Sequence, residues 1–122
     1  MKRSMMVDAE AQGREKNQTE SPICCKECGQ VAVRNRGREG LKVAGEHTFR
    51  NPAGYSFHVI VFREAEGCLF VGEAVSEASW FPPHSWRIAL CSKCHAHLGW
   101  GFEASGEASF VGLIATRLTG LR

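Results

Sequence analysis

Four of the six cysteines form two CxxC pairs, Cys25 with Cys28 and Cys91 with Cys94, separated by residues 29–90. Thiolate sulfur is a preferred ligand of Zn²⁺, and four cysteines complete its tetrahedral shell without leaving a position for water or substrate. The pattern therefore predicts one structural Zn²⁺ per chain. Because the pairs are far apart in the sequence, we expect the metal to join distant segments of one domain.

Other uses of the cysteines fit the sequence less well. The stretch CSKCH at 91–95 also matches a haem attachment motif, but such attachment requires export, and no apolar export segment is found near residue 1. Neither CxxC pair begins a helix of a βαβ unit, as a thioredoxin-like redox site requires. We interpret His95 and His97 as solvated or outer-shell residues, and Cys24 and Cys68 as packing residues.

All three tryptophans lie in one stretch, SWFPPHSWRIALCSKCHAHLGWGF at 79–102. Trp100 and Phe102 are two residues apart in a predicted strand and so share a face, and Trp80 and Trp86 flank a proline-containing turn that would bring their strands side by side. The rings could fill the core or form an aromatic cage over a flat or cationic ligand, and both interpretations stay open on these residues alone. Other apolar residues are predicted to supply a core without them: Val59, Val61, Leu69, Val71, Ile88, Leu90, Val111, Leu113 and Ile114.

The composition suits a single globular domain. The chain has 122 residues, of which 43% are hydrophobic and 23% charged. Residues 1–20 have no periodic apolar face, so we expect a disordered lead-in there and the domain over 21–122. No apolar stretch approaches the ~18 residues of a membrane span, and with no export segment and many cysteines, a cytoplasmic location and no membrane partner are expected. The net charge of +2 and a basic run at 34–42 without aromatic residues argue against a nucleic-acid partner.

Short β-strands are expected to position these residues, and no amphipathic helix is apparent. Runs rich in β-branched and aromatic residues alternate with Gly, Pro, Ser and Glu. The sequence Asn51-Pro52-Ala53-Gly54 is a turn signal, which predicts a hairpin over 46–62. Gly29 follows the first CxxC pair, where a left-handed turn would direct backbone amides at the thiolates. Further strands are predicted at 30–33, 68–75, 86–90, 98–102 and 109–118.

Several spaced motifs together resemble the CULT family, the cereblon-type thalidomide-binding domain. They are CKEC at 25–28, NPAGY at 51–55, SWFPPHSW at 79–86, CSKCHAHLGWGF at 91–102 and FVGLIATRL at 110–118. The resemblance covers about residues 23–118 and implies a β-tent, in which a four-cysteine zinc site pins two antiparallel sheets together. Cereblon's ubiquitin-ligase role depends on further domains for which this chain has no room, so stand-alone bacterial members of the family are the closer match.

The resemblance also implies a ligand. Trp80, Trp86 and Trp100 would be the walls of a cage, with Phe102 as its base, that binds cyclic imides such as the glutarimide of thalidomide-type drugs, uracil-like rings or the C-terminal cyclic imide of a peptide. Asn51, Pro52 and Phe57 would form the covering loop and its neighbour. The stretch Ala78, Ser79 and Trp80 would offer backbone groups to the imide. Cereblon has a histidine where this chain has Ala78, but that contact is made by the backbone.

Two other functions compete with imide binding. The β-tent is shared with methionine sulfoxide reductases of the B type, whose attacking cysteine lies on a late strand, whereas no cysteine follows Cys94 here. A cage could instead bind a quaternary ammonium such as methyl-lysine or choline, helped by Glu77 and Glu103. Because imide recognition needs neither a nucleophile nor a proton transfer, we expect a binding module and not an enzyme.

Overall fold

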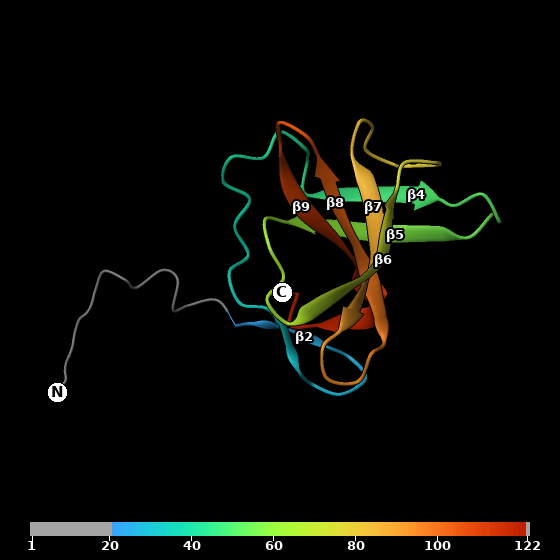
Figure 1. The fold of residues 1–122 in the computed structure, drawn as a ribbon. Coiled ribbons are helices and arrows are strands. Elements are labelled where there is room, and N and C mark those ends of the chain that lie inside the picture. Colours follow the sequence, from blue (N-terminus) through green and yellow to red (C-terminus); the bar gives the residue numbers. More distant parts are fainter. Residues whose placement is uncertain (1–20, 122) are drawn as a thin grey trace, which may run out of the picture.

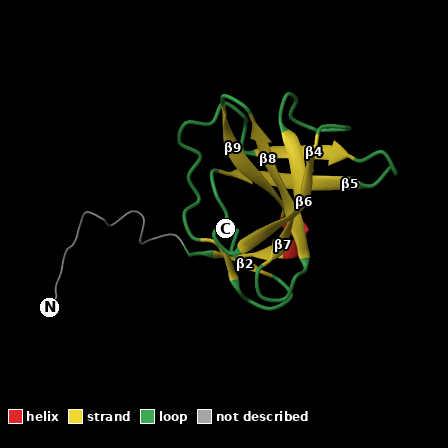
Figure 2. Ribbon diagram, viewed as in Figure 1, coloured by secondary structure: helices red, strands yellow, loops and turns green. Residues whose placement is uncertain are grey.

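The computed structural model describes residues 21–121, which form two antiparallel β-sheets. Over this range there is no α-helix, and the helical structure is limited to the 3-10 turn η1 (Ala115–Arg117), as Figure 2 shows. The prediction of a mainly β fold with two antiparallel sheets is confirmed. Residues 1–20, the predicted lead-in, lie outside the described residues. Within 21–121 no helix has the length and apolar character needed to cross a membrane.

The larger sheet has six strands and the smaller has three, and every pairing is antiparallel. The small sheet lies at one end of the large sheet (Figure 1). In spatial order the large sheet consists of β4 (Glu46–Arg50), β5 (Ser56–Phe62), β9 (Glu107–Ile114), β8 (His97–Ala104), β7 (Ser85–Cys91) and β6 (Cys68–Val75). The small sheet consists of β10 (Leu118–Thr119), β2 (Ile23–Cys25) and β3 (Val31–Val33).

Strands β4 and β5 form the predicted hairpin, with Phe49 opposite Phe57. Its turn is closed by Asn51, whose N–H donates to the Tyr55 carbonyl at 2.8 Å and whose Oδ1 accepts from the Tyr55 N–H at 2.9 Å. The large sheet twists so strongly that this hairpin projects at a wide angle to β7 and β8 (Figure 1). The turn therefore lies beside the tryptophans rather than beyond the end of the sheet.

A continuous apolar core joins the two sheets. The small sheet contributes Ile23, Val33 and Leu118, which pack with buried residues of the large sheet such as Leu98 and Leu113. A second cluster lies under the hairpin and is aromatic, with Phe81, Phe102 and Phe110 buried beside Val61. All three tryptophans pack against the second cluster without being buried themselves.

Three of the nine predicted core residues are exposed. Leu69, Val71 and Ile88 are 45%, 38% and 37% exposed, so their prediction as core is wrong. Val71 lies directly opposite Ile88 at the edge of the large sheet. The apolar pattern of a strand shows which residues share a face, but whether another layer covers that face depends on the whole fold.

Two further predictions about the strands are corrected. The segment predicted as one strand at 109–118 divides into β9, the turn η1 and the start of β10, because the chain leaves the large sheet there and enters the small one. Trp80 does not lie in a strand but in the loop between β6 and β7. The turn after it is therefore part of the long loop that connects the antiparallel neighbours β6 and β7.

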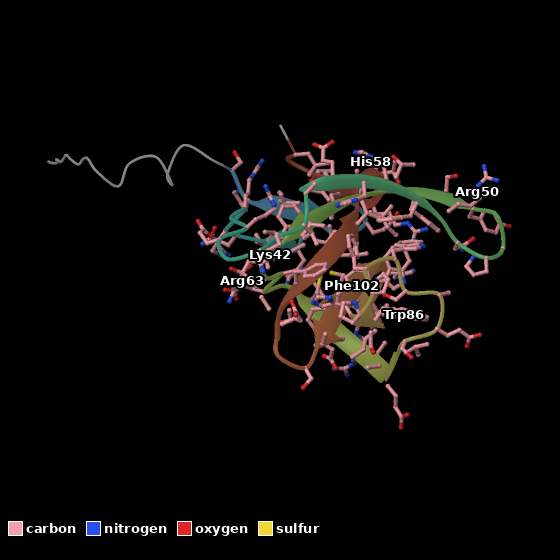
Figure 3. All side chains as sticks on the ribbon, turned by 90° about the horizontal axis from the view of Figure 1, so that it is seen from above. Lys42, Arg50, His58, Arg63, Trp86 and Phe102 are labelled. Carbon is pink, nitrogen blue, oxygen red and sulfur yellow. The ribbon has the colours of Figure 1, made fainter. Side chains whose placement is uncertain are left out.

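Arginine side chains hold the irregular segment 34–45 to the domain. Arg36 donates to the carbonyls of Ser21 and Leu121, at 2.7 and 3.2 Å, and Arg63 donates to the Glu39 carbonyl at 2.7 Å. Figure 3 shows Lys42 and Arg63 together at the opposite end of the molecule from Arg50. Arg36 of the basic run is thus used in packing the loop against the domain.

Candidate metal centre and tryptophan cage

The fold brings the four predicted cysteine ligands together. The Sγ atoms of Cys25, Cys28, Cys91 and Cys94 all lie within 4.8 Å of one another. Cys25 and Cys94 are 3.7 Å apart at sulfur, and Cys28 and Cys91 are 3.6 Å apart. A tetrahedral Zn²⁺ with bonds of ~2.3 Å places its sulfur ligands ~3.8 Å from each other. The cluster therefore has the donor set and the size for such an ion, and it connects β2 of the small sheet to β7 of the large sheet.

The two CxxC turns repeat one backbone pattern. The N–H of Gly29 donates to the Cys25 carbonyl at 2.8 Å, and the N–H of His95 donates to the Cys91 carbonyl at 2.9 Å. Gly29 has φ of 82°, as predicted, and His95 occupies the same left-handed region at 65°. This turn directs the Gln30 N–H at the Cys28 sulfur, 3.4 Å away. Such donors stabilise negative charge on the sulfur ligands.

The thiols of the cluster influence one another's pKa. Burial raises the pKa of Cys91, but hydrogen bonds from the Cys94 and Lys93 backbone and from the Cys28 thiol outweigh it and lower the pKa to about 7. The backbone of Ala96 lowers the pKa of Cys94, yet desolvation and the neighbouring thiols raise it to about 12. Ionisation of one thiol discourages ionisation of the next, and a bound cation would favour the ionised form of all four.

Cys68 lies opposite Cys91 on β6 but is not one of the clustered ligands. Burial, with the charges of Cys91 and Cys25, raises the pKa of its thiol to about 12. It packs as a neutral thiol in the core that joins the sheets. Neither Cys68 nor Cys24 is in a disulfide, and all six cysteines of the chain are free thiols.

A cavity of about 220 Å³ opens between the three tryptophans. Trp80 and Trp100 meet edge to face at 4.8 Å, and the Trp86 Nε1–H donates to the Glu77 carbonyl at 2.9 Å, which fixes the third indole. Trp86 and Phe102 lie on the same side of the β4–β5 hairpin (Figure 3). The cavity, called the cage below, is lined by Asn51, Pro52, Ala78, Trp80, Trp86, Trp100 and Phe102.

Two of the residues predicted from the resemblance do not line the cage. Phe57 lies behind it, with its ring 5.4 Å from Trp100 and 6.2 Å from Trp80. The Ser79 hydroxyl accepts a hydrogen bond from the Phe81 N–H at 3.2 Å and so shapes the loop. Phe49 was not among the predicted site residues, but its ring stacks on Trp80 with a centroid distance of 4.7 Å and an interplanar angle of 9°. Its position opposite Phe57 in the predicted hairpin was the available signal.

Ala78 and Trp80 both line the cage and also have backbone groups without a partner in the protein, over residues 21–121. Ala78 has φ of 58°, a left-handed conformation that turns the chain sharply before Trp80. Over residues 21–121, the Ala78 carbonyl and the Trp80 N–H form no hydrogen bond within the protein. One acceptor and one donor are thus available in the loop that carries the first indole. Among residues 21–121 no carboxylate lines the cage, and Glu103 lines a different hollow, beside Phe70 and Arg87.

The fold and these sites define a small β domain with a four-cysteine cluster able to hold a metal ion at one end and an aromatic cavity at the other. No model of a known protein family matches the chain. Curated proteins named cereblon do match: the protein from Danio rerio is 31% identical over 84 residues, covering 67% of this chain and 20% of its own length. Those from Xenopus tropicalis and Gallus gallus are 33% and 32% identical, cover 67% and 68% of this chain, and are each matched over 19% of their length.

The chain is thus a cereblon-like domain of the CULT type. It spans about a fifth of the length of the curated relatives that it matches. The predicted resemblance is confirmed at the level of the domain.

Proposed function

We propose that this domain binds small cyclic imides in the tryptophan cage and that its four cysteines hold a structural Zn²⁺. The observation that carries the proposal is the pairing of an apolar cavity with an available backbone acceptor and donor, at Ala78 and Trp80. A cyclic imide presents one N–H between two carbonyls and a compact ring with C–H edges. The indoles would enclose the ring, and the backbone would meet its polar edge.

The size of the cage favours a small ligand. Its volume of about 220 Å³ lies below the ~300–1,000 Å³ of pockets for drug-sized molecules. A single six-membered ring such as glutarimide or uracil suits that volume, and a larger substituent would project through the open side. The same arrangement would admit the C-terminal cyclic imide of a peptide. The Asn51 amide nitrogen, with its oxygen held by Tyr55, would be available to such a substituent.

The lining also argues against a cation. A quaternary ammonium gains from several ring faces and from nearby negative charge. One face of Trp80 is already covered by Phe49, and none of the lining residues is acidic. Imide recognition makes and breaks no covalent bond, so we propose a binding domain without catalytic activity.

The extent of the domain, its compartment and its metal can be proposed on the same basis. We propose that residues 21–122 are the binding unit and that it works in the reducing cytoplasm, where clustered cysteines are kept available for a metal. Zn²⁺ is proposed as the metal because four thiolates at tetrahedral spacing match its preferred ligands. The sulfur shell would leave it no open position, so it would act in folding and not in ligand chemistry.

A pair of ligands tests the mechanism directly. Calorimetry with glutarimide and N-methylglutarimide should show binding of the first and none of the second. The methyl group removes the imide donor, leaves a desolvated carbonyl unpaired at a cost of ~1–3 kcal/mol, and adds bulk where the backbone is closest. Trimethyl-lysine serves as the comparison ligand. Binding of trimethyl-lysine alone, or equal binding of the methylated imide, would show that the cage recognises something else.

A further inference from the structure

His84 is the single polar or charged side chain that is buried among residues 21–121, with 8% exposure. It lies four residues after Trp80, in the loop that leads into β7. Its Nδ1 is 3.2 Å from the Phe81 carbonyl oxygen, and its Nε2 is 3.0 Å from the Ala108 carbonyl oxygen. The ring also packs on Phe110 at 4.9 Å. Both of its nitrogen atoms therefore face hydrogen-bond acceptors.

A neutral imidazole can donate to only one of these carbonyls, although the Phe81 carbonyl also accepts the His84 backbone N–H. It has one N–H, so the second nitrogen presents a lone pair to an oxygen that is also electron-rich. An imidazolium has two N–H groups and donates to both carbonyls. Proton uptake therefore adds a hydrogen bond. The protonated ring then links the Phe81 carbonyl, within the 81–84 turn, to the Ala108 carbonyl at the start of β9.

This turn is packed against the cage. The His84 N–H donates to the Phe81 carbonyl at 2.7 Å, which closes the turn. The Phe81 ring meets Phe102 at 4.9 Å and Phe49 at 5.2 Å, and Phe49 in turn stacks on Trp80. A shift of the turn must move Phe81, and Phe81 is directly bonded along the chain to Trp80. The position of the first cage wall thus depends on how firmly the turn is held.

We propose that His84 is a positioning residue that couples proton uptake to ligand affinity in the cage, an inference that rests on the proposed imide-binding function. The protonated ring holds the turn, and with it Trp80, in the geometry that binds. Affinity for glutarimide is then higher in mild acid than in mild base. The gain is that of one hydrogen bond, roughly two- to tenfold in affinity.

Other charged or titratable side chains lie near the turn, and the histidines among them serve as control positions in the experiment. Lys42 and Glu107 line the same hollow as His84 and carry opposite charges. His47 packs on the far side of Phe81 at 5.0 Å and has one carbonyl neighbour, that of Ala44. His97 packs on Trp100 at 5.0 Å, and burial lowers its pKa.

The experiment compares glutarimide affinity at about pH 5.5 and about pH 8 in the unaltered protein, His84→Gln, His47→Gln and His97→Gln. Glutamine keeps an amide donor but does not titrate over this range. We expect the pH dependence to disappear in His84→Gln and to persist in the other two variants. A constant affinity in the unaltered protein, or a pH dependence retained by His84→Gln, would overturn the proposal.

A second readout needs neither a variant at His84 nor a ligand. In ¹⁵N NMR of the unaltered protein, the Trp80 indole N–H signal, assigned with Trp80→Phe, should shift with pH at the same midpoint as the His84 ring nitrogens. An indole signal that ignores the His84 titration contradicts the coupling. If glutarimide binds at no pH, the proposed function fails, while this measurement still decides whether His84 controls Trp80.

Discussion

At the scale of single residues, the three tryptophans differ from the aromatic residues that hold the fold. Phe81, Phe102 and Phe110 are buried, with 8%, 2% and 3% exposure, whereas each tryptophan is only half-buried. A half-buried indole that faces a cavity has fewer packing partners to lose on truncation than a buried ring has. Binding in the proposed cage and stability are therefore expected to depend on different members of one aromatic cluster.

Truncation of a cage wall should separate these two properties. Trp86→Ala and Trp100→Ala are each expected to abolish glutarimide binding while the metal content and a cooperative melt persist. Leu98→Ala is the matched control, because Leu98 is fully buried and its truncation should cost ~2–5 kcal/mol of unfolding free energy. Calorimetry and chemical denaturation on the three variants make the comparison. If the tryptophan variants lose as much stability as Leu98→Ala, the rings are core residues and the cage interpretation fails.

At the scale of elements, the two CxxC turns share a backbone conformation but differ in the residue that follows the second cysteine. The position after the second cysteine is left-handed in both, and it is filled by Gly29 in one turn and by His95 in the other. Only glycine adopts this region without steric cost. The second turn therefore retains strain that the first avoids, and the rest of the structure must hold Cys91 and Cys94 in this conformation.

Substitutions of Gly29 and His95 should change the unfolding free energy in opposite directions. Gly29→Ala is expected to lower the unfolding free energy by ~1–2 kcal/mol, since a Cβ there meets no atom within 4 Å and the cost is conformational alone. His95→Gly should raise it by ~0.5–1 kcal/mol, the relief of strain being offset in part by the entropy of an unfolded glycine. Thermal denaturation of the metal-loaded variants gives both values. A loss of stability in His95→Gly would show that the imidazole makes a contact that outweighs the strain.

The sequence predicts those elements that are determined by residues close together in the chain. The hairpin follows from the Asn51 to Gly54 turn and from β-branched residues on both sides, and the CxxC spacing gives the metal ligands. The turn η1 is different, because the Arg117 carbonyl accepts the Lys26 N–H and its guanidinium donates to the His97 carbonyl, both distant in sequence. Phe49 was missed for the same reason: its stacking on Trp80 depends on the twist of the whole sheet. Residues that act through distant neighbours cannot be found from periodicity.

At the scale of the whole molecule, β7 separates the two sites. It begins beside Trp86 and ends at the metal ligand Cys91, and five residues of strand span roughly 17 Å. An ion held by the cysteines therefore cannot touch a ligand in the cage. The sheets are joined by the cysteine cluster and by an apolar core that includes Ile23 and Leu113. A metal held by the cysteines would thus reinforce a contact that apolar burial also stabilises.

Removal of the metal should consequently destabilise the small sheet and, through it, the domain. One Zn²⁺ per chain is expected by elemental analysis, and a strong chelator should lower the melting temperature sharply, since ion-binding free energy becomes folding free energy. Cys91→Ser should abolish the zinc and the cooperative melt, because it removes a fully buried ligand. Cys24→Ser is the matched control: Cys24 adjoins Cys25 in β2 but lies outside the cluster, so zinc and stability should be nearly unchanged. A chelated protein that melts as before would mean that the apolar core alone holds the two sheets and that the four cysteines have no structural metal role.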